Sequence, residues 1–222
     1  HLSPQRFMDG MDRALARTGV TLLSETEAVG WRTEGRRVTA VRTNRGDFSV
    51  DEYVLCGGAW SPNVARELRL SLSMQAGKGY SLTLPNPRQL PERCAIFAEA
   101  RVAVTPMDGA LRFGGTMEIA GLNEAINPAR VRGIINAVPR YFPEFKSEDF
   151  RYVEPWSGLR PCSPDGLPYV GRFAAYENLS TATGHAMMGL SLGPITGELL
   201  AGIICGERPA YDLALLSPDR YA

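Results

Sequence analysis

A short, uninterrupted apolar run is the feature that most constrains the fold of this chain. Tyr53–Cys56 contains no strongly polar side chain and stops at a pair of glycines, after which a helical pattern begins at Asn63. Strands that read as continuous apolar runs are buried on both faces, as in the sheets of α/β proteins. The run therefore predicts a buried strand in an α/β sheet, followed by a glycine turn and a helix.

The residues before this run carry clear start and turn signals. Ser3 followed by Pro4 predicts a helix that runs to about Arg17, because serine caps a helix and proline is favoured at its first position. Alternating apolar runs separated by turns then predict a strand meander. The runs are Val20–Leu23, Val29–Trp31, Val38–Val41 and Phe48–Val50.

The middle of the chain, from about Met74 to Trp156, is richer in strand patterns. One helix interrupts them, from Pro128 to about Tyr141, with Asn127 as its cap. We expect a separate antiparallel sheet with a covering helix. Its strands are predicted at Tyr80–Leu84, Arg101–Thr105 and Leu111–Thr116.

In the last third, Trp156–Gly166 is rich in proline and glycine and predicts a loop. A strand at Leu179–Thr183 follows, then a segment bounded by Gly184 and Gly189, then a helix to about Cys205. A strand, a glycine turn and a helix present backbone N–H groups to an anionic or electron-rich ligand. This segment is therefore a candidate binding site.

Charge and composition exclude several classes of function. The chain has 24 basic and 24 acidic residues, so no net positive charge favours nucleic acid or an anionic membrane surface, and a small-molecule partner is expected. With only His1 and His185, a histidine-rich metal site is excluded. The cysteines are far apart and predict free thiols in a reducing compartment. They are Cys56, Cys94, Cys162 and Cys205.

The chain has no apolar run of roughly 18 residues, so no membrane span is expected. No charged-then-apolar leader opens it. We expect a soluble cytoplasmic protein, with peripheral attachment to an inner membrane left open.

Two glycine turns are candidate cofactor contacts. Gly57-Gly58-Ala59-Trp60 is either a tight turn or a surface on which a ribose or adenine lies against the backbone. The segment Gly184–Gly189 is either a bent helix start or a site where helix amides stabilise negative charge, such as that at the N1–C2=O edge of a reduced flavin. Taken alone, His185 is interpreted as a structural residue.

Arg160 is the candidate for substrate binding. Pro161 favours an extended backbone at Arg160, and an arginine fork suits bidentate capture of a carboxylate. The competing interpretation is a solvated surface arginine.

Four blocks together resemble the D-amino-acid dehydrogenase small subunit and the glycine and sarcosine oxidases, which are FAD enzymes of the D-amino-acid oxidase superfamily. The blocks occur in that family's order and spacing, and the resemblance to the C-terminal half of the family spans almost the whole chain. They are Lys78–Leu84, Arg112–Met117, Trp156–Pro161 with Ser163–Gly171, and Ala182–His185 followed by Gly189.

The resemblance implies FAD as cofactor and an amino acid as substrate, whose α-hydrogen passes as hydride to flavin N5 without a protein base. Arg160 is then the catalytic residue that binds the substrate carboxylate, helped by Tyr80 and Trp156. The implied cofactor contacts are Gly57, Gly58, Ala59, Trp60, Gly184, His185, Met188, Gly189 and Leu190.

The resemblance also implies a division into domains and a mixed α/β fold. Residues 1–72 are expected to form part of a Rossmann-like FAD domain, and residues 73–155 an antiparallel substrate domain. Residues 156–222 are expected to return to the FAD domain and to end in its C-terminal helix.

Two departures bear on activity. Glycine-oxidase-like members have arginine at Met187 and a tyrosine on the strand Val102–Val104, so a D-amino acid or cyclic imino acid larger than glycine is expected as substrate. No GxGxxG occurs, so the chain is expected to bind FAD weakly and to be inactive alone. The missing half is either truncated or supplied by another chain. A non-catalytic partner subunit remains the alternative, and oxidase and dehydrogenase activities are not separated.

Overall fold

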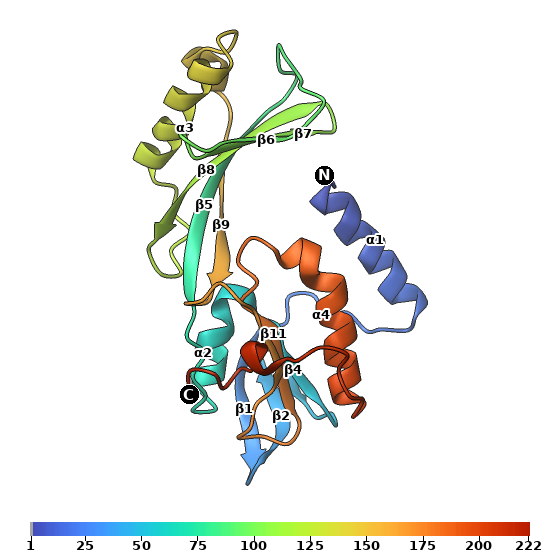
Figure 1. Cartoon of the computed structure of the whole chain (residues 1–222). Coiled ribbons are helices and arrows are strands. Elements are labelled where there is room, and N and C mark those ends of the chain that lie inside the picture. The colour runs from blue at the N-terminus through green and yellow to red at the C-terminus, as the bar shows by residue number, and fades with distance from the viewer. Residues whose placement is uncertain (1) are drawn as a thin grey trace. The chain divides into compact units, whose positions relative to one another are not determined.

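The computed structural model describes residues 2–222, which form two compact units (Figure 1). Unit 1 contains the residues up to Val20 together with Gly77–Leu159, and unit 2 contains Thr21–Ala76 together with Arg160–Ala222. Each unit is thus built from two separate stretches of chain. The predicted functional domains, with boundaries after residues 72 and 155, stay a prediction.

Unit 1 is a five-stranded sheet with a helix on one face (Figure 1). The neighbouring pairs β6/β7, β7/β8 and β8/β5 are antiparallel. The strands lie in the order β6 (Ala95–Phe97), β7 (Val102–Met107), β8 (Ala110–Ile119), β5 (Gln75–Leu84) and β9 (Pro155–Cys162). The first residues of β5, up to Ala76, and the last residues of β9, from Arg160, belong to unit 2. The helices of this unit are α1 (Pro4–Arg17), α3 (Pro128–Tyr141) and the short 3-10 helix η2 (Ser147–Phe150).

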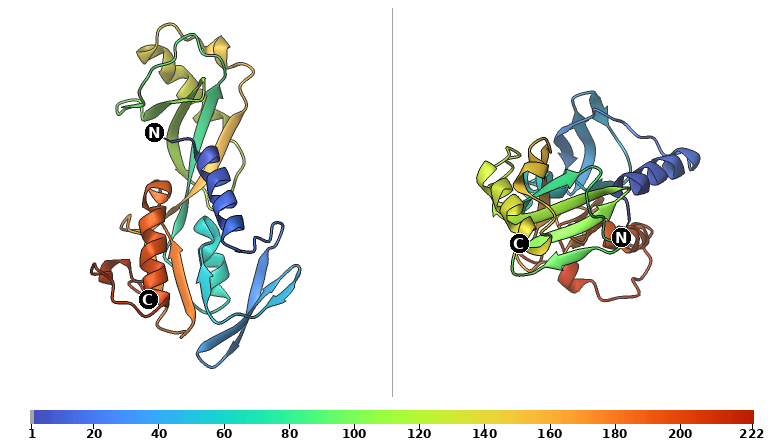
Figure 2. Two further views of the ribbon diagram at one scale, coloured as in Figure 1. Left: turned by 90° about the vertical axis from the view of Figure 1, so that its right-hand side faces the viewer. Right: turned by 90° about the horizontal axis from the view of Figure 1, so that it is seen from above.

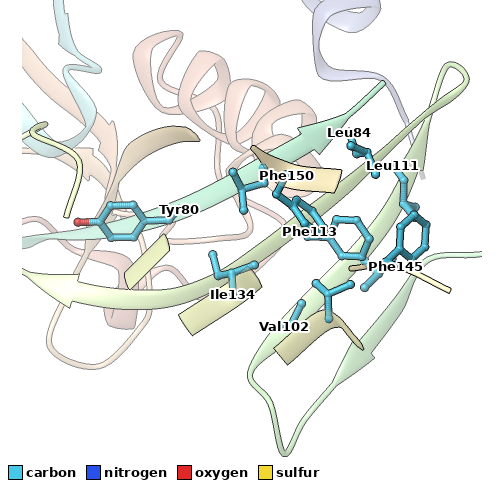
Figure 3. Packing of buried hydrophobic residues seen from close by; sticks show 11 residues of the cluster. Tyr80, Leu84, Val102, Leu111, Phe113, Ile134, Phe145 and Phe150 are labelled. Carbon is cyan, nitrogen blue, oxygen red and sulfur yellow. The ribbon is translucent and has the colours of Figure 1, made fainter. Parts of the chain in front are cut away.

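The core of unit 1 lies between α3 and one face of this sheet (Figure 3). Phe113 is fully buried there, and its ring meets those of Phe142, Phe145 and Phe150 edge to face. Aromatic pairs prefer this edge-to-face geometry. Because successive side chains of a strand alternate between faces, Arg112 beside Phe113 points away from the core.

Unit 2 holds two three-stranded sheets. The first is the antiparallel meander of β1 (Ala28–Glu34), β2 (Arg37–Thr43) and β3 (Gly46–Phe48). The second has the order β10 (Tyr169–Arg172), β11 (Leu179–Thr183) and β4 (Tyr53–Leu55), with β11 and β4 parallel. The remaining elements are η1 (Gly58–Trp60), α2 (Ser61–Arg66), α4 (Gly189–Ile204) and η3 (Ala214–Leu216).

Helix α4 packs against β10 and β11 within unit 2 (Figure 2). Buried polar groups join the two sheets. Asn178 is 1% exposed, and its amide exchanges hydrogen bonds with the backbone N–H and carbonyl of Val38 at 2.9 and 2.8 Å. These bonds satisfy buried polar atoms that would otherwise be costly to bury.

The predicted mixed α/β fold class is confirmed, and both capped helices begin and end where the sequence predicts. Ser3 Oγ accepts from the N–H of Arg6, and Asn127 Oδ1 accepts from that of Ala129 at 3.0 Å. The strand predicted at Tyr53–Cys56 is found at Tyr53–Leu55, but it is not buried on both faces, because Val54 is 40% exposed while Tyr53 and Leu55 are buried.

Two predictions of secondary structure are wrong. Val20–Leu23 forms no strand, and its apolar side chains are largely exposed. Trp156–Gly166 is not all loop, because β9 occupies Pro155–Cys162. This strand lies at the edge of the sheet, where proline is tolerated since one side of the strand needs no ladder hydrogen bonds.

Among residues 2–222, no helix combines the length and the apolar character needed to cross a bilayer. His1 lies outside the described residues.

Candidate cofactor and substrate site

The turn between β11 and α4 has a backbone that favours glycine. Gly184 has φ +82°, and a β-carbon added there would lie 3.0 Å from Cδ2 of Tyr169. Ala186 has φ +48°, although it is not glycine. Such left-handed conformations in non-glycine residues cost energy and cluster at binding sites. The turn is therefore held in a defined shape by its surroundings.

The amino end of α4 is open to a ligand. Met188 occupies the N-cap position without a side-chain cap, and the first turn has no acidic residue. Met187 and Met188 are 76% and 52% exposed. The first N–H groups of a helix have no intrahelical partner and carry the positive end of its dipole. This end of α4 suits an electron-rich or anionic group, and Gly189 and Leu190 lie in the same first turn.

His185 ties this turn to α4. Its Nε2 lies 2.9 Å from Oγ1 of Thr196, a buried residue in the middle of the helix. Burial lowers the pKa of His185 below its ordinary value, so the ring is neutral at neutral pH. These contacts agree with the structural role inferred from the sequence. A contact between His185 and the cofactor stays a prediction.

Arg160 lies on β9, and the two residues that follow it, Pro161 and Cys162, form backbone contacts with the turn between β11 and α4. The carbonyl oxygen of Pro161 accepts a hydrogen bond from the N–H of Ala186 at 2.9 Å, and Cys162 forms a β-bridge with His185. Arg160 is half-buried and, among the described residues, has no carboxylate within 4.0 Å. A half-buried guanidinium without an acidic partner is available to an anionic ligand.

The turn after β4 is joined to the turn after β11 by hydroxyl groups. Gly58 has φ +54°, and its carbonyl accepts from Thr183 Oγ1 at 3.3 Å. Ser61, fully buried, donates to the same Thr183 oxygen at 3.2 Å. The carboxyl ends of two parallel strands therefore bring the two predicted cofactor segments together, as in nucleotide-binding sheets.

The residues Gly57–Trp60 differ in their exposure. Ala59 is buried, whereas Trp60 is 47% exposed. Trp60 lines a hollow of about 390 Å³ with Trp31 and Glu67. The backbone of this segment, more than the Trp60 ring, lies beside Thr183.

Tyr80 is buried in unit 1, with its ring on the α3 side of the sheet (Figure 3). Its hydroxyl donates to Glu118, which also accepts from Asn127 Nδ2 at 3.3 Å. The buried Lys78 ammonium lies 3.7 Å from Glu118 and donates to the carbonyl of Ala125 at 2.8 Å. These contacts favour a positioning role for Tyr80, and its predicted contact with substrate stays a prediction.

Trp156 is 59% exposed on β9. Its indole lies over Gly158, since a β-carbon there would meet Cη2 of Trp156 at 2.3 Å. The guanidinium of Arg112 is 6.0 Å from the indole centroid. The exposed ring is therefore available to a ligand, as its predicted role requires.

Sequence reasoning missed the polar residues that hold these segments. Thr183 is the last residue of β11 and Ser61 the first of α2, positions that give a weak signal in the sequence. The group of Lys78, Tyr80 and Glu118 gives no such signal, because 38 residues separate Tyr80 from Glu118.

Comparison with known proteins supports the resemblance. Residues 1–203 match the model of the DAO family, described as FAD dependent oxidoreductase. A D-amino acid dehydrogenase of Granulibacter bethesdensis is 34% identical over 218 residues, and one of Vibrio vulnificus is 35% identical over 218 residues. Each alignment covers 97% of this chain and 51% of the relative, so the chain spans about half the length of these curated relatives.

Solved structures of glycine oxidases are also similar to this chain. Glycine oxidase from Geobacillus kaustophilus matches 94% of this chain and 56% of its own, with a TM-score of 0.84 and 29% identity. Glycine oxidase from Bacillus cereus has the same coverage, with a TM-score of 0.77 and 26% identity.

Proposed function

This chain belongs to the DAO family of FAD-dependent oxidoreductases, and from that premise we propose that it forms part of an enzyme oxidising the C–N bond of D-amino or cyclic imino acids. The observation that carries the proposal is a backbone hydrogen bond between β9, the strand that contains Arg160, and the turn before α4. That bond joins Pro161 to Ala186. The Arg160 guanidinium, which has no carboxylate within 4.0 Å among residues 2–222, and the amino end of α4 thus belong to neighbouring segments of one unit.

The residues in the two turns fit FAD. The positive φ angles of Gly58 and Gly184 leave backbone unobstructed by a β-carbon, and the α4 amino end has neither a side-chain cap nor an acidic residue. We propose that Gly184–Leu190 holds the flavin ring and ribityl chain, and that Gly57–Trp60 lies against the nucleotide part. FAD, when bound, supplies the electron acceptor for the oxidation.

Arg160 binds the substrate carboxylate in this proposal. Two parallel hydrogen bonds from a guanidinium fix both the position and the direction of a carboxylate. Orientation of this kind accounts for much of the rate when the cofactor carries the chemistry. No protein base is assigned, since His185 Nε2 is already bonded to Thr196.

Unit 2 is proposed as part of the FAD-binding domain and unit 1 as the substrate-binding domain. No GxGxxG occurs in the 222 residues, so the FAD diphosphate is proposed to be held by residues outside this sequence. By itself the chain is then expected to bind FAD weakly and to show no activity.

The test uses the protein expressed from its complete coding sequence. We expect a yellow protein that reduces an artificial dye with one or more members of a panel of D-amino acids. Arg160→Ala is expected to lower kcat/KM by about 100-fold or more, the loss typical of a charged partner removed from a buried pair, while FAD content stays near that of the wild type.

The matched control is Arg208→Ala, which removes an exposed arginine of the same unit and is expected to leave kcat/KM unchanged. A complete polypeptide that neither retains FAD nor reduces dye would overturn the proposal and favour a non-catalytic partner subunit.

A further inference from the structure

The face of the unit 1 sheet opposite α3, here called the polar face, carries a second arginine. Leu82 and Phe113 point into the core, so their neighbours in β5 and β8 point to the polar face. Across the two strands, Ser81 is paired with Gly114, and Thr83 with Arg112. The polar face therefore has a row of small and hydroxyl side chains beside Arg112.

Arg112 is held in one orientation by neutral partners. Its Nε donates to Thr83 Oγ1 at 3.0 Å, and its guanidinium lies 6.0 Å from the Trp156 ring centroid. The side chain is half-buried, and within residues 2–222 no carboxylate lies within 4.0 Å of it. Since Thr83 occupies only Nε, the two terminal nitrogens have no protein acceptor in the described chain.

The Trp156 indole lies beside this guanidinium and packs over Gly158. Three of its ring carbons would lie within 3.1 Å of a β-carbon at Gly158, so the ring rests on bare backbone. With 59% of its surface exposed, Trp156 leaves one side for a ligand. An aromatic surface next to an arginine can pack the methylene groups of a ligand whose end is charged.

Ser81 supplies an unused hydrogen-bonding group on the same face. It is 5% exposed, and among residues 2–222 its Oγ has no hydrogen-bond partner. Buried polar atoms are normally satisfied, so an orphaned hydroxyl indicates a missing partner. Gly114 on β8 is paired with Ser81, and Ala103 on β7 is paired with Gly114. Because these residues are small, their side chains leave space above the sheet at this position.

We propose that Arg112, positioned by Thr83 and flanked by Ser81 and Trp156, binds a carboxylate on the substrate's side chain. The enzyme would then prefer dicarboxylic amino acids to neutral ones. This inference rests on the proposed function, in which unit 1 is the substrate-binding domain, and extends it to the substrate's side chain. A planar guanidinium with two free nitrogens matches a carboxylate in charge and in geometry.

The first test compares D-glutamate with D-glutamine, which have the same shape and differ in charge, on the complete flavoprotein. The wild type is expected to have the higher kcat/KM with D-glutamate. Arg112→Gln is expected to lower the ratio of the two kcat/KM values by about tenfold or more, since a charge-assisted hydrogen bond is lost. Thr83→Val, which removes only the oxygen that positions Nε, is expected to lower the ratio less.

Controls separate this effect from misfolding. Arg93→Gln removes an exposed arginine of the same unit and is expected to leave the ratio unchanged. FAD content and thermal midpoint are measured for every variant. Arg112→Lys keeps the charge without the planar fork, and it is expected to recover only part of the ratio.

The second test measures binding without turnover, by calorimetric titration of the complete flavoprotein with glutarate or pentanoate. The wild type is expected to bind glutarate more tightly, and Arg112→Gln is expected to remove that difference. A wild type that uses D-glutamine at least as well as D-glutamate, or an Arg112→Gln variant with both ratios unchanged, would overturn the inference and leave the proposed function standing.

If instead the wild type oxidises no amino acid at all, the proposed function fails. The titrations with glutarate and pentanoate then decide whether Arg112 forms a carboxylate site. Tighter binding of glutarate that depends on Arg112 retains the carboxylate site, and equal binding of both acids removes it.

Discussion

The N–H of Ala186 donates to the carbonyl oxygen of Pro161 at 2.9 Å, which joins the turn before α4 to the residue that follows Arg160. The bridge between Cys162 and His185 extends this connection by one more residue. Backbone contacts therefore join the candidate cofactor segment to the strand that contains Arg160.

The shape of this turn can be tested at Gly184. Alanine there is strained at φ +82° and places its β-carbon 3.0 Å from the Tyr169 ring, so Gly184→Ala is expected to lower the free energy of unfolding by about 1–3 kcal/mol. The control is Gly197→Ala in α4, where a β-carbon meets nothing within 4 Å. That change is expected to add about 0.5–1 kcal/mol, because alanine is the better helix former. Denaturant unfolding measures both, and equal effects would contradict the described turn.

Arg220 fastens the C-terminal segment to unit 2, and this contact has a defined pH dependence. Its nitrogens donate to both oxygens of Asp165 at 3.0 Å, and its guanidinium lies 3.8 Å from the Tyr169 ring centroid. The hydrogen bonds from Arg220 hold the pKa of Asp165 well below its ordinary value. The stabilisation is then complete above the unfolded-state pKa of about 3.9 and is lost as the pH falls below it.

We therefore expect Asp165→Asn to lower the thermal midpoint at pH 7, with a difference from the wild type that shrinks progressively as the pH falls from about 4 to 2. Thermal scans across this range measure it. Asp51→Asn, an exposed aspartate of the same unit, is expected to change the midpoint little at any pH. A constant difference between Asp165→Asn and the wild type at all pH values would show that the ion pair is not its source.

The group of Lys78, Tyr80 and Glu118 predicts strong coupling between two charges. Lys78 is 2% exposed, and Glu118 is the carboxylate beside it. The hydrogen bond from Tyr80 lowers the pKa of Glu118, which keeps the carboxylate charged. Glu118→Gln leaves the buried ammonium without its counter-charge and is expected to lower the thermal midpoint by roughly 5–10 °C.

The double variant Lys78→Met, Glu118→Gln removes both charges and is expected to recover most of that loss, since a buried pair is often replaceable by apolar packing. Thermal unfolding of the two single variants and the double variant completes the cycle. Additive losses would mean that the two charges do not interact.

The position of the Trp156 ring over Gly158 gives a spectroscopic prediction. A β-carbon at residue 158 has no room beneath the indole, so Gly158→Ala is expected to displace the ring and change its near-UV circular dichroism. Gly133→Ala in α3, where a β-carbon meets nothing within 4 Å, is expected to leave that spectrum unchanged. Identical spectra for both variants would contradict the described ring position.

Elements defined by neighbouring residues were predictable from the sequence, and those defined by distant partners were not. Ser3 and Asn127 cap the two helices whose limits were predicted, because a cap bonds to residues two or three positions away. The strand β9 was predicted as loop, since its glycine and prolines are compatible with a strand only at a sheet edge.

The same distinction applies to the candidate site. The local sequence pattern predicts the glycine turn at Gly184. It does not predict that the N–H of Ala186 in this turn donates to the carbonyl oxygen of Pro161, because no local rule determines which carbonyl accepts this hydrogen bond. The burial of Tyr80 likewise depends on which face of β5 is covered by α3. The sequence identifies Arg112 only as part of a family block, and only the fold shows that no carboxylate of residues 2–222 lies within 4.0 Å of its guanidinium.

The parallel pairing of β4 with β11 sets an order of events during synthesis. Thr181 Oγ1 bonds to the carbonyl of Leu55 at 2.7 Å across 126 residues of sequence. At roughly 5–20 residues per second, the ribosome needs roughly 6–25 s to deliver the second strand after the first. During that time the segment Tyr53–Leu55 has been translated without its neighbouring strand, and the Gly77–Leu159 part of unit 1 is translated in the interval. Nascent-chain pausing between the two strands would lengthen this exposure.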